Sequence, residues 1–167
     1  FSYLEQAAPF PKFIECHRLS PFPARSTDIG VVLDLMIHDL DVVMAFVKSP
    51  VVSVDAVGIP VLSRSEDIAN ARLRFANGCV ANLTASRISP ERMRKIRVFS
   101  GGAMTSYVSL DYRAQEGFIY RIARDGEEES SLLKKLMAAK ISKDMTVVSE
   151  FGGKRIEREP VPIQKDE

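Results

Sequence analysis

The sequence has no excess of charge, little cysteine and no long apolar segment, and each of these absences excludes a class of protein. Twenty-three basic and twenty-two acidic residues leave a net charge of +1, which provides no general attraction for nucleic acid or for an anionic membrane. No apolar segment reaches the roughly 18 residues that a membrane-spanning helix needs, and the N-terminus shows no signal peptide. We therefore expect a cytoplasmic protein with no nucleic-acid and no membrane partner.

The two cysteines and the known catalytic motifs narrow the choice further. Cys16 and Cys79 are far apart, lack metal-ligand spacing and fall in apolar, strand-like segments, so we expect reduced core residues and no metal site. The sequence contains no glycine-rich phosphate loop, no HExxH and no GxSxG. The absence of these motifs therefore predicts that this chain by itself has no nucleotide, zinc protease or hydrolase site.

The length and the apolar content are those of one globular domain. A chain of 167 residues with 46% apolar residues can bury about two thirds of its unfolded surface. We expect residues 1–167 to form a single domain. The chain begins with Phe1 and ends in charged residues directly after a strand-like segment, so we also expect it to be part of a longer protein.

The clearest predicted element is an apolar helix over residues 30–47. Thr27 and Asp28, just ahead of it, are suitable N-caps. Residues 48–50, the last of which is proline, are typical of a helix C-terminus. This helix would pack in the core.

Most of the remaining chain is typical of strands. Asn77-Gly78 between two alternating arms predicts a hairpin. Residues 132–143 predict a short basic amphipathic helix, whose pattern favours a solvent-exposed segment over contact with a membrane or partner. Further strands are expected at 12–18, 51–60, 92–100, 103–112 and 116–124, with a proline-punctuated edge strand at 155–163. One helix followed by six or seven strands predicts an α+β fold: an open, mostly antiparallel sheet with the helix packed on one face.

Three polar residues interrupt the apolar helix. Asp34, His38 and Asp41 follow an i, i+4, i+7 spacing and would lie on one stripe. In one interpretation Asp34 and His38 bond each other or nearby backbone and are structural, as buried polar groups usually are. In the other, the carboxylate orients an imidazole one turn away, which suits proton transfer to or from a hydroxyl. Asp41 is explained equally well by a salt bridge or a cap.

A basic cluster follows the hairpin. It could contact phosphate groups of a substrate or of RNA, but few aromatic residues lie among its members, which favours a solvated strand surface. The cluster consists of Arg87, Arg92, Arg94, Lys95 and Arg97.

The segment VVLDLMIHDLDVVMAF resembles the helix that opens the C-terminal domain of the Gfo/Idh/MocA oxidoreductases, in which a DxxxH-type helix lies at the active site. The order of the other features is similar: a strand and a loop before the helix, the hairpin RLRFANGCVANLTASR after it, and a strand pair ending in SLDYRAQ. The resemblance implies a glyceraldehyde-3-phosphate dehydrogenase-like C-terminal domain and dimer contacts through the open sheet face. It also implies an N-terminal Rossmann domain, which is absent from this chain, as are the family's Glu-Lys-Pro motif and the helix after the last strand.

The resemblance assigns roles to residues of the helix and of the segment before it. His38 would take the proton from a sugar hydroxyl while hydride passes to NAD or NADP, and Asp34 would hold and tune it. Because the absent domain would bind most of the cofactor, this chain alone is expected to be inactive, and NAD and NADP both stay open. Arginine binds phosphate in a bidentate manner, and the candidate substrate-binding residues are His17, Arg18, Ser20 and Arg25.

The combination of HRLSPF with DLMIHDLD is similar to the subgroup of UDP-N-acetylglucosamine 3-dehydrogenases, which favours a sugar or nucleotide-sugar substrate. The alternative is a non-catalytic dimerisation or binding module whose polar stripe is structural. Solvent access to Asp34 and His38 discriminates between the two. If both side chains are sealed and every polar atom is paired within this domain, the module is favoured, whereas a shared cleft that opens toward the N-terminus favours the enzyme.

Overall fold

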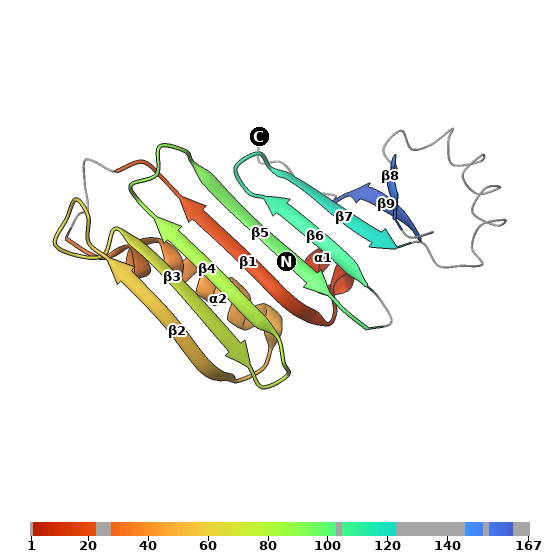
Figure 1. Cartoon of the computed structure of the whole chain (residues 1–167), viewed down its shortest axis with the longest axis horizontal. Coiled ribbons are helices and arrows are strands. Elements are labelled where there is room, and N and C mark those ends of the chain that lie inside the picture. Colours follow the sequence, from red (N-terminus) through yellow and green to blue (C-terminus); the bar gives the residue numbers. More distant parts are fainter. Residues whose placement is uncertain (1, 23–27, 103–104, 123–145, 152–153, 162–167) are drawn as a thin grey trace.

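The computed structural model describes residues 2–22, 28–102, 105–122, 146–151 and 154–161, and these form one open sheet with helices on one side (Figure 1). The sheet has nine strands in the described residues, in the order β2-β3-β4-β1-β5-β6-β7-β9-β8. The predicted α+β class, with an open, mostly antiparallel sheet, is confirmed. The strands are β1 (Pro11–Leu19), β2 (Val51–Ile59), β3 (Ile68–Phe75), β4 (Val80–Ser86), β5 (Met93–Ser100), β6 (Ser106–Asp111), β7 (Glu116–Ile122), β8 (Thr146–Phe151) and β9 (Lys154–Pro160).

The first strand lies in the middle of the sheet. β1 pairs in parallel with β4, where Cys16 lies beside Leu83, and antiparallel with β5, where Cys16 lies beside Ile96. The other pairings are antiparallel, so β2–β4 and β5–β7 are two meanders joined through β1.

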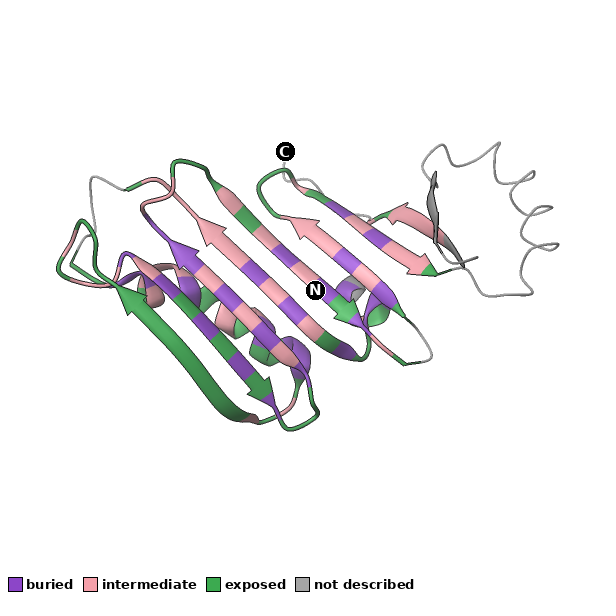
Figure 2. Ribbon diagram, in the orientation of Figure 1, coloured by how far each residue is buried: buried purple, intermediate pink, exposed green. Residues whose placement is uncertain are grey.

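Alternation along the strands gives the sheet two different faces. Side chains of one face are buried against the helices and form the core, and we call this the helix face. The opposite side is the open face, whose side chains are half-buried or exposed, and Figure 2 shows the alternation most clearly along β3. The buried helix-face residues include Ile14, Cys16, Leu73, Phe75, Leu83, Ile96, Val98, Val108 and Ile119.

The predicted helix is present but begins differently from the prediction. It consists of a π-helical turn, η1 (Val32–Met36), followed by α2 (Ile37–Val47). No side chain of Val31 or Met36, the residues that precede the two segments, makes a capping hydrogen bond. Val31 holds the N-cap position and Thr27 lies outside the described residues, so Asp28 is not the N-cap that the sequence predicts.

The helix ends at the hairpin between β3 and β4. Lys48 adopts a left-handed conformation with φ 51° and donates its backbone N–H to Met44, which ends the helix. The amide of Asn77 reaches the Val47 carbonyl at 3.5 Å. Gly78 has φ 83°, a conformation that favours glycine, and the predicted Asn-Gly hairpin is confirmed.

Three elements differ from the expectations, and one predicted element is not tested. The sequence analysis missed both the short helix α1 (Ser2–Ala7) and the edge strand β8. The last predicted strand is present as β9, but it lies between β7 and β8 rather than at the edge. The predicted amphipathic helix at 132–143 lies outside the described residues.

The two cysteines lie in the core, as predicted. Both are free and buried, Cys16 on β1 and Cys79 directly before β4. Burial is the main cause that raises the pKa of the Cys16 thiol to about 12 and that of the Cys79 thiol to about 11. None of the helices in the described residues has the length and apolar character needed to cross a membrane.

Candidate functional site

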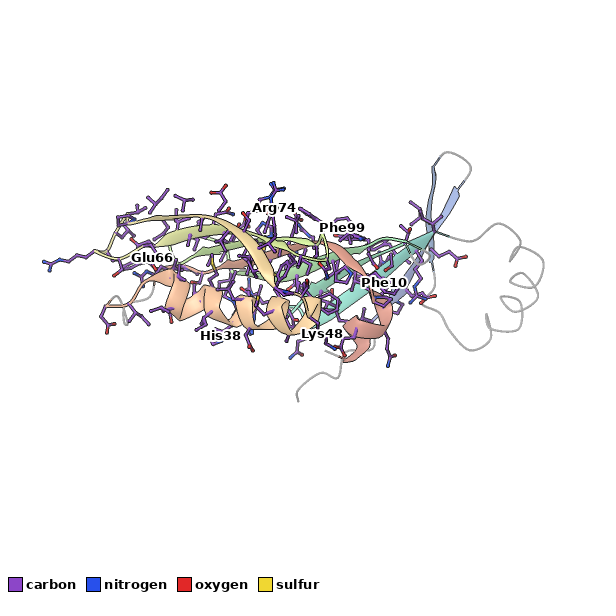
Figure 3. The ribbon with its side chains drawn as sticks, turned by 90° about the horizontal axis from the view of Figure 1, so that it is seen from below. Phe10, His38, Lys48, Glu66, Arg74 and Phe99 are labelled. Atoms are coloured by element: carbon purple, nitrogen blue, oxygen red, sulfur yellow. The ribbon has the colours of Figure 1, made fainter. Side chains whose placement is uncertain are left out.

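The polar stripe of the helix lies on its outer side, away from the sheet. Met36 and Val43 are buried against the sheet, whereas His38 and Asp41 are exposed and Asp34 is half-buried. Figure 3 shows His38 on the side of the helix that points away from the strands. The expectation that this helix packs in the core holds for the side that faces the sheet, and the polar stripe lies on the side that the sheet does not cover.

Asp34 and His38 are accessible and are not joined to each other. Within the described part of the chain, no hydrogen bond links the Asp34 carboxylate to the His38 imidazole. The interpretation in which these two side chains satisfy each other in a sealed core therefore does not hold for this chain. Both side chains can therefore be reached by a bound molecule, although neither of them lines the two hollows described below.

Apolar side chains flank the stripe and are also exposed. Leu33 is 64% exposed, and Ile37 and Met44 are each 45% exposed. An exposed apolar patch beside polar groups marks a surface where another molecule or another part of a protein binds. An apolar groove of about 610 Å³ lies on the other flank, between the helix and β2, and is lined by Met36 and Leu40 but not by Asp34 or His38.

The first turn of the helix, which contains Asp34, has an unusual width. Ile37 donates its backbone N–H to the carbonyl of Val32, five residues earlier instead of the usual four. Single π-helical turns of this kind are often found at functional sites.

Glu66 caps this turn from the loop between β2 and β3. The backbone N–H of Val31 donates to the Glu66 carbonyl at 2.9 Å, and that of Val32 donates to the Glu66 Oε1 at 3.3 Å. A carboxylate at this place is favourable because the N-terminus of a helix carries partial positive charge. Gly30 leaves the necessary room, since a Cβ there would overlap the Glu66 carboxylate.

A buried ion pair stands next to this cap. The Arg87 Nε donates to the Asp67 Oδ1 at 2.7 Å, and both side chains are fully buried. Arg87 also donates to the Ile29 carbonyl at 2.7 Å, which fixes the chain where it enters the helix. Asp67 accepts further bonds from the backbone N–H groups of the β2–β3 loop, from Val61 to Ser63. The expectation that Arg87 belongs to a surface cluster is thus wrong.

Asp67 is ionised in this network. Burial by itself raises the pKa of its carboxyl, but the N–H groups of Val61, Ser63 and Leu62 and the Arg87 guanidinium together hold that pKa well below its usual range. Donors aimed at a buried carboxylate favour its charged form.

Arg18 is paired with a residue that the sequence analysis did not single out. Its Nε and Nη2 donate to the two carboxylate oxygens of Asp39 at 2.8 and 2.6 Å. The hydrogen bond to Asp39 is the main cause that raises the pKa of Arg18. Asp39 directly follows His38, so this pair ties β1 to the helix beside the imidazole.

Of the other candidate residues, His17 and Ser20 lie in the described part of the chain, and His17 lies apart from the Asp34 and His38 pair. His17 lies on the open face, where it lines a polar hollow of about 440 Å³, because neighbouring residues of a strand point to opposite faces. It therefore does not share a cleft with Arg18, and the alternation within the predicted strand would have revealed this. The Ser20 backbone bridges Ser86 and Ser89, and Arg25 lies outside the described residues.

Comparisons with known proteins bear on the family and the fold of this chain. The chain is 41% identical over 119 residues to UDP-N-acetylglucosamine 3-dehydrogenase of Acidithiobacillus ferrooxidans, a match that covers 71% of this chain and 37% of that protein. A solved structure of that enzyme, GnnA, matches with a TM-score of 0.74 and 33% identity, over 99% of this chain and 45% of the other. The chain therefore spans less than half the length of these relatives.

A more distant match shows the fold alone. The WlbA dehydrogenase of Bordetella pertussis, solved in complex with NADH and UDP-GlcNAcA, has a TM-score of 0.52 at 18% identity, over 65% of this chain and 37% of the other.

The sequence also matches a protein-family model. That model describes the GFO/IDH/MocA C-terminal domain and matches residues 11–104, more than half of the chain. The chain belongs to the GFO/IDH/MocA family, and its sheet and helix are those of the family's C-terminal domain.

Proposed function

We propose that this chain is the substrate-binding and dimerisation domain of a nicotinamide-dependent dehydrogenase that acts on a sugar or nucleotide sugar, with UDP-N-acetylglucosamine as the favoured substrate. The observation that carries the proposal is the accessible pair of Asp34 and His38 on the outer side of the helix, flanked by exposed apolar side chains. The relative that is 41% identical is a UDP-N-acetylglucosamine 3-dehydrogenase, which supports the substrate class.

The proton chemistry follows from the two side chains. In this proposal His38 accepts the proton of the substrate hydroxyl, and Asp34 orients the imidazole and stabilises its charged form. The exposed flank of Leu33 and Ile37 would be covered in the full-length protein, which would exclude water from the reacting carbon. Arg18 and Asp39 hold the helix against β1 and thereby fix the position of the neighbouring His38.

The residues of this chain fit the proton transfer but not the binding of a dinucleotide. The sequence has an imidazole and a carboxylate at the right spacing, but no glycine-rich loop that could hold a pyrophosphate. When bound, NAD or NADP supplies the hydride acceptor. We propose that a part of the full-length protein outside this chain binds it.

The open face supports the proposed homodimer. Four aromatic rings form a continuous row across β1, β5, β6 and β7, with ring centroids 5.9, 4.6 and 5.3 Å apart. A row of this kind on a solvated sheet face is typical of surfaces that bind another protein. The four residues are Phe13, Phe99, Tyr107 and Tyr120.

The proposed activity can be tested by nicotinamide reduction in the full-length protein. Turnover of UDP-N-acetylglucosamine, UDP-glucose and free N-acetylglucosamine would be measured for three proteins: wild type, His38→Ala and a control variant. The control is Glu91→Ala, at an exposed residue before β5. We expect turnover of the nucleotide sugar, a loss on the order of a hundredfold in His38→Ala, and no change in the control.

The outcome also decides between the enzyme and the module. Unchanged turnover in His38→Ala would contradict its role in proton transfer. If no substrate is turned over by a full-length protein that has bound its cofactor and forms a dimer, the alternative of a non-catalytic dimerisation module gains support.

A further inference from the structure

We propose that Glu66 is a positioning residue for Asp34 and His38, because it holds the first turn of the helix in the wide π-helical form. The inference rests on the proposed function of that pair. Within the described residues, no hydrogen bond or ion pair joins the Glu66 side chain to Asp34 or His38. It acts through the backbone of Val31 and Val32, to which it is hydrogen-bonded.

The width of the first turn determines how the pair is aligned. In a regular α-helix each residue advances by about 100°, so that residues four apart are about 40° out of line. A turn closed by a bond to the fifth residue contains an extra residue, and each of its steps rotates by less. Because the turn at Val32–Met36 includes Asp34, it brings the Asp34 carboxylate closer to the line of His38.

Glu66 supplies the bonds that this turn needs at its start. The first N–H groups of a helix have no partner within it, and here Val31 and Val32 use the carbonyl and the carboxylate of Glu66. The usual cap, a polar side chain at the N-cap position, is not present here, because Val31 holds that position and makes no side-chain hydrogen bond. In Figure 3 Glu66 lies at the N-terminal end of the helix, between the helix and the sheet.

The support of Glu66 is rigid. Its neighbour Asp67 is fully buried and bonded to Arg87, which also holds the Ile29 carbonyl at the entry to the helix. The loop that carries Glu66 and the chain that enters the helix are therefore fixed to the same buried ion pair. A loss of the Glu66 carboxylate cannot be compensated by a shift of that loop.

A substitution at Gly30 gives a second way to displace the Glu66 carboxylate. A Cβ at Gly30 would occupy the space of the Glu66 carboxylate, so Gly30→Ala must displace that carboxylate from the helix. The structure thus predicts that Gly30→Ala and Glu66→Ala act by the same route. Once the Glu66 side chain has been removed, the added methyl group has nothing left to displace.

The kinetic test compares variants in the full-length enzyme. We expect Glu66→Ala and Gly30→Ala each to lower kcat by about tenfold or more, as small misplacements of catalytic groups do, with KM for the nucleotide sugar within about twofold of wild type. Glu66→Gln should keep most of the activity, because its amide oxygen still accepts the bond from Val32. The double variant Gly30→Ala/Glu66→Ala should be no worse than Glu66→Ala alone. An additive loss in the double variant, or a change in KM alone, would overturn the proposal.

A second measurement is independent of activity. Amide hydrogen exchange of Ile37, whose N–H closes the π-helical turn, should be at least tenfold faster in Glu66→Ala than in wild type. It should be unchanged in Glu91→Ala, which serves as the matched control in both experiments. Unchanged exchange in Glu66→Ala would overturn the role of Glu66 even if the enzyme proves to have another substrate. Changed exchange in a protein without dehydrogenase activity would instead contradict only the proposed function.

Discussion

Arg18 on β1 and Asp39 on the helix form a two-pronged ion pair, with distances of 2.8 and 2.6 Å between their nitrogen and oxygen atoms. Their side chains are only 13% and 15% exposed. Parallel hydrogen bonds between a guanidinium and a carboxylate are among the stronger polar contacts in proteins. The pair therefore fixes the distance between the helix and the central strand, directly beside His38.

This pair should contribute measurably to stability. In a double-mutant cycle of Arg18→Ala and Asp39→Ala, we expect a coupling free energy of about 1–3 kcal/mol from urea unfolding. The more exposed pair of Lys95 and Asp111, 3.2 Å apart, is the control and should give less than about 1 kcal/mol. Equal coupling in the two pairs would contradict the structural role of Arg18.

The buried carboxylate of Asp67 should make the fold sensitive to acid. Its pKa in the folded state lies well below the usual range, whereas the unfolded chain has a pKa of about 3.9. The stabilisation is thus fully present above about pH 4 and is lost progressively as the pH falls toward the lower, folded-state pKa.

Urea unfolding between pH 7 and pH 2.5 tests this expectation. Wild type should lose stability below about pH 4 more steeply than Asp67→Asn. Asp28→Asn, at an exposed carboxylate, should follow the wild-type curve. Parallel curves for wild type and Asp67→Asn would contradict the assignment.

The two thiols should be inert in the native protein. At pH 8 a thiol with a pKa of about 12, as for Cys16, is a thiolate roughly a thousand times less often than a free cysteine. Iodoacetamide should therefore modify neither Cys16 nor Cys79 in native buffer, and both of them in urea at about 8 M. Intact-mass measurement after labelling checks this. Rapid native labelling of either residue would show that its burial is wrong.

Tyr107→Glu should prevent the proposed dimerisation through the open face. A carboxylate in the middle of the aromatic row would be desolvated without a partner at the interface. Sedimentation of this chain is expected to show a dimer for wild type and a monomer for the variant. Met44→Glu, which places the same charge on the outer side of the helix, should remain dimeric. A dimer that survives Tyr107→Glu would place the interface elsewhere.

The isolated chain should not bind NADH or NADPH with micromolar affinity. It has no glycine-rich loop for the pyrophosphate. Titration calorimetry of the chain with each cofactor checks this directly, with the full-length protein as the positive control. Micromolar binding by the chain would mean that its own residues form a dinucleotide site.

Local patterns in the sequence predicted the main elements because those elements are encoded locally. The spacing of Asp34, His38 and Asp41 correctly places them on one stripe, and Asn77-Gly78 correctly predicts the hairpin. The exposure of that stripe was not predictable from the apolar character of the helix, since the exposed flank of Leu33 and Ile37 has the same composition as its buried side.

The supports of the site come from distant parts of the chain, and local reasoning missed them. Glu66 caps a turn that begins 34 positions earlier, and no pattern near Thr27 or Asp28 indicates this. The sequence favours a solvated surface for Arg87 because basic residues cluster around it with few aromatic residues among them. Its partner Asp67 lies 20 positions away, and only the folded sheet brings the two together.

The central position of the first strand sets the order in which the sheet can assemble. The meanders β2–β4 and β5–β7 pair between neighbours in sequence and need no help from the N-terminus. β1 must wait for both, because Phe13 pairs with Val80 on one side and with Phe99 on the other. Contacts between such distant residues form slowly, since a long loop must close first. Among the strands of this sheet, β1 is therefore the earliest in sequence and the last that can find both of its neighbours.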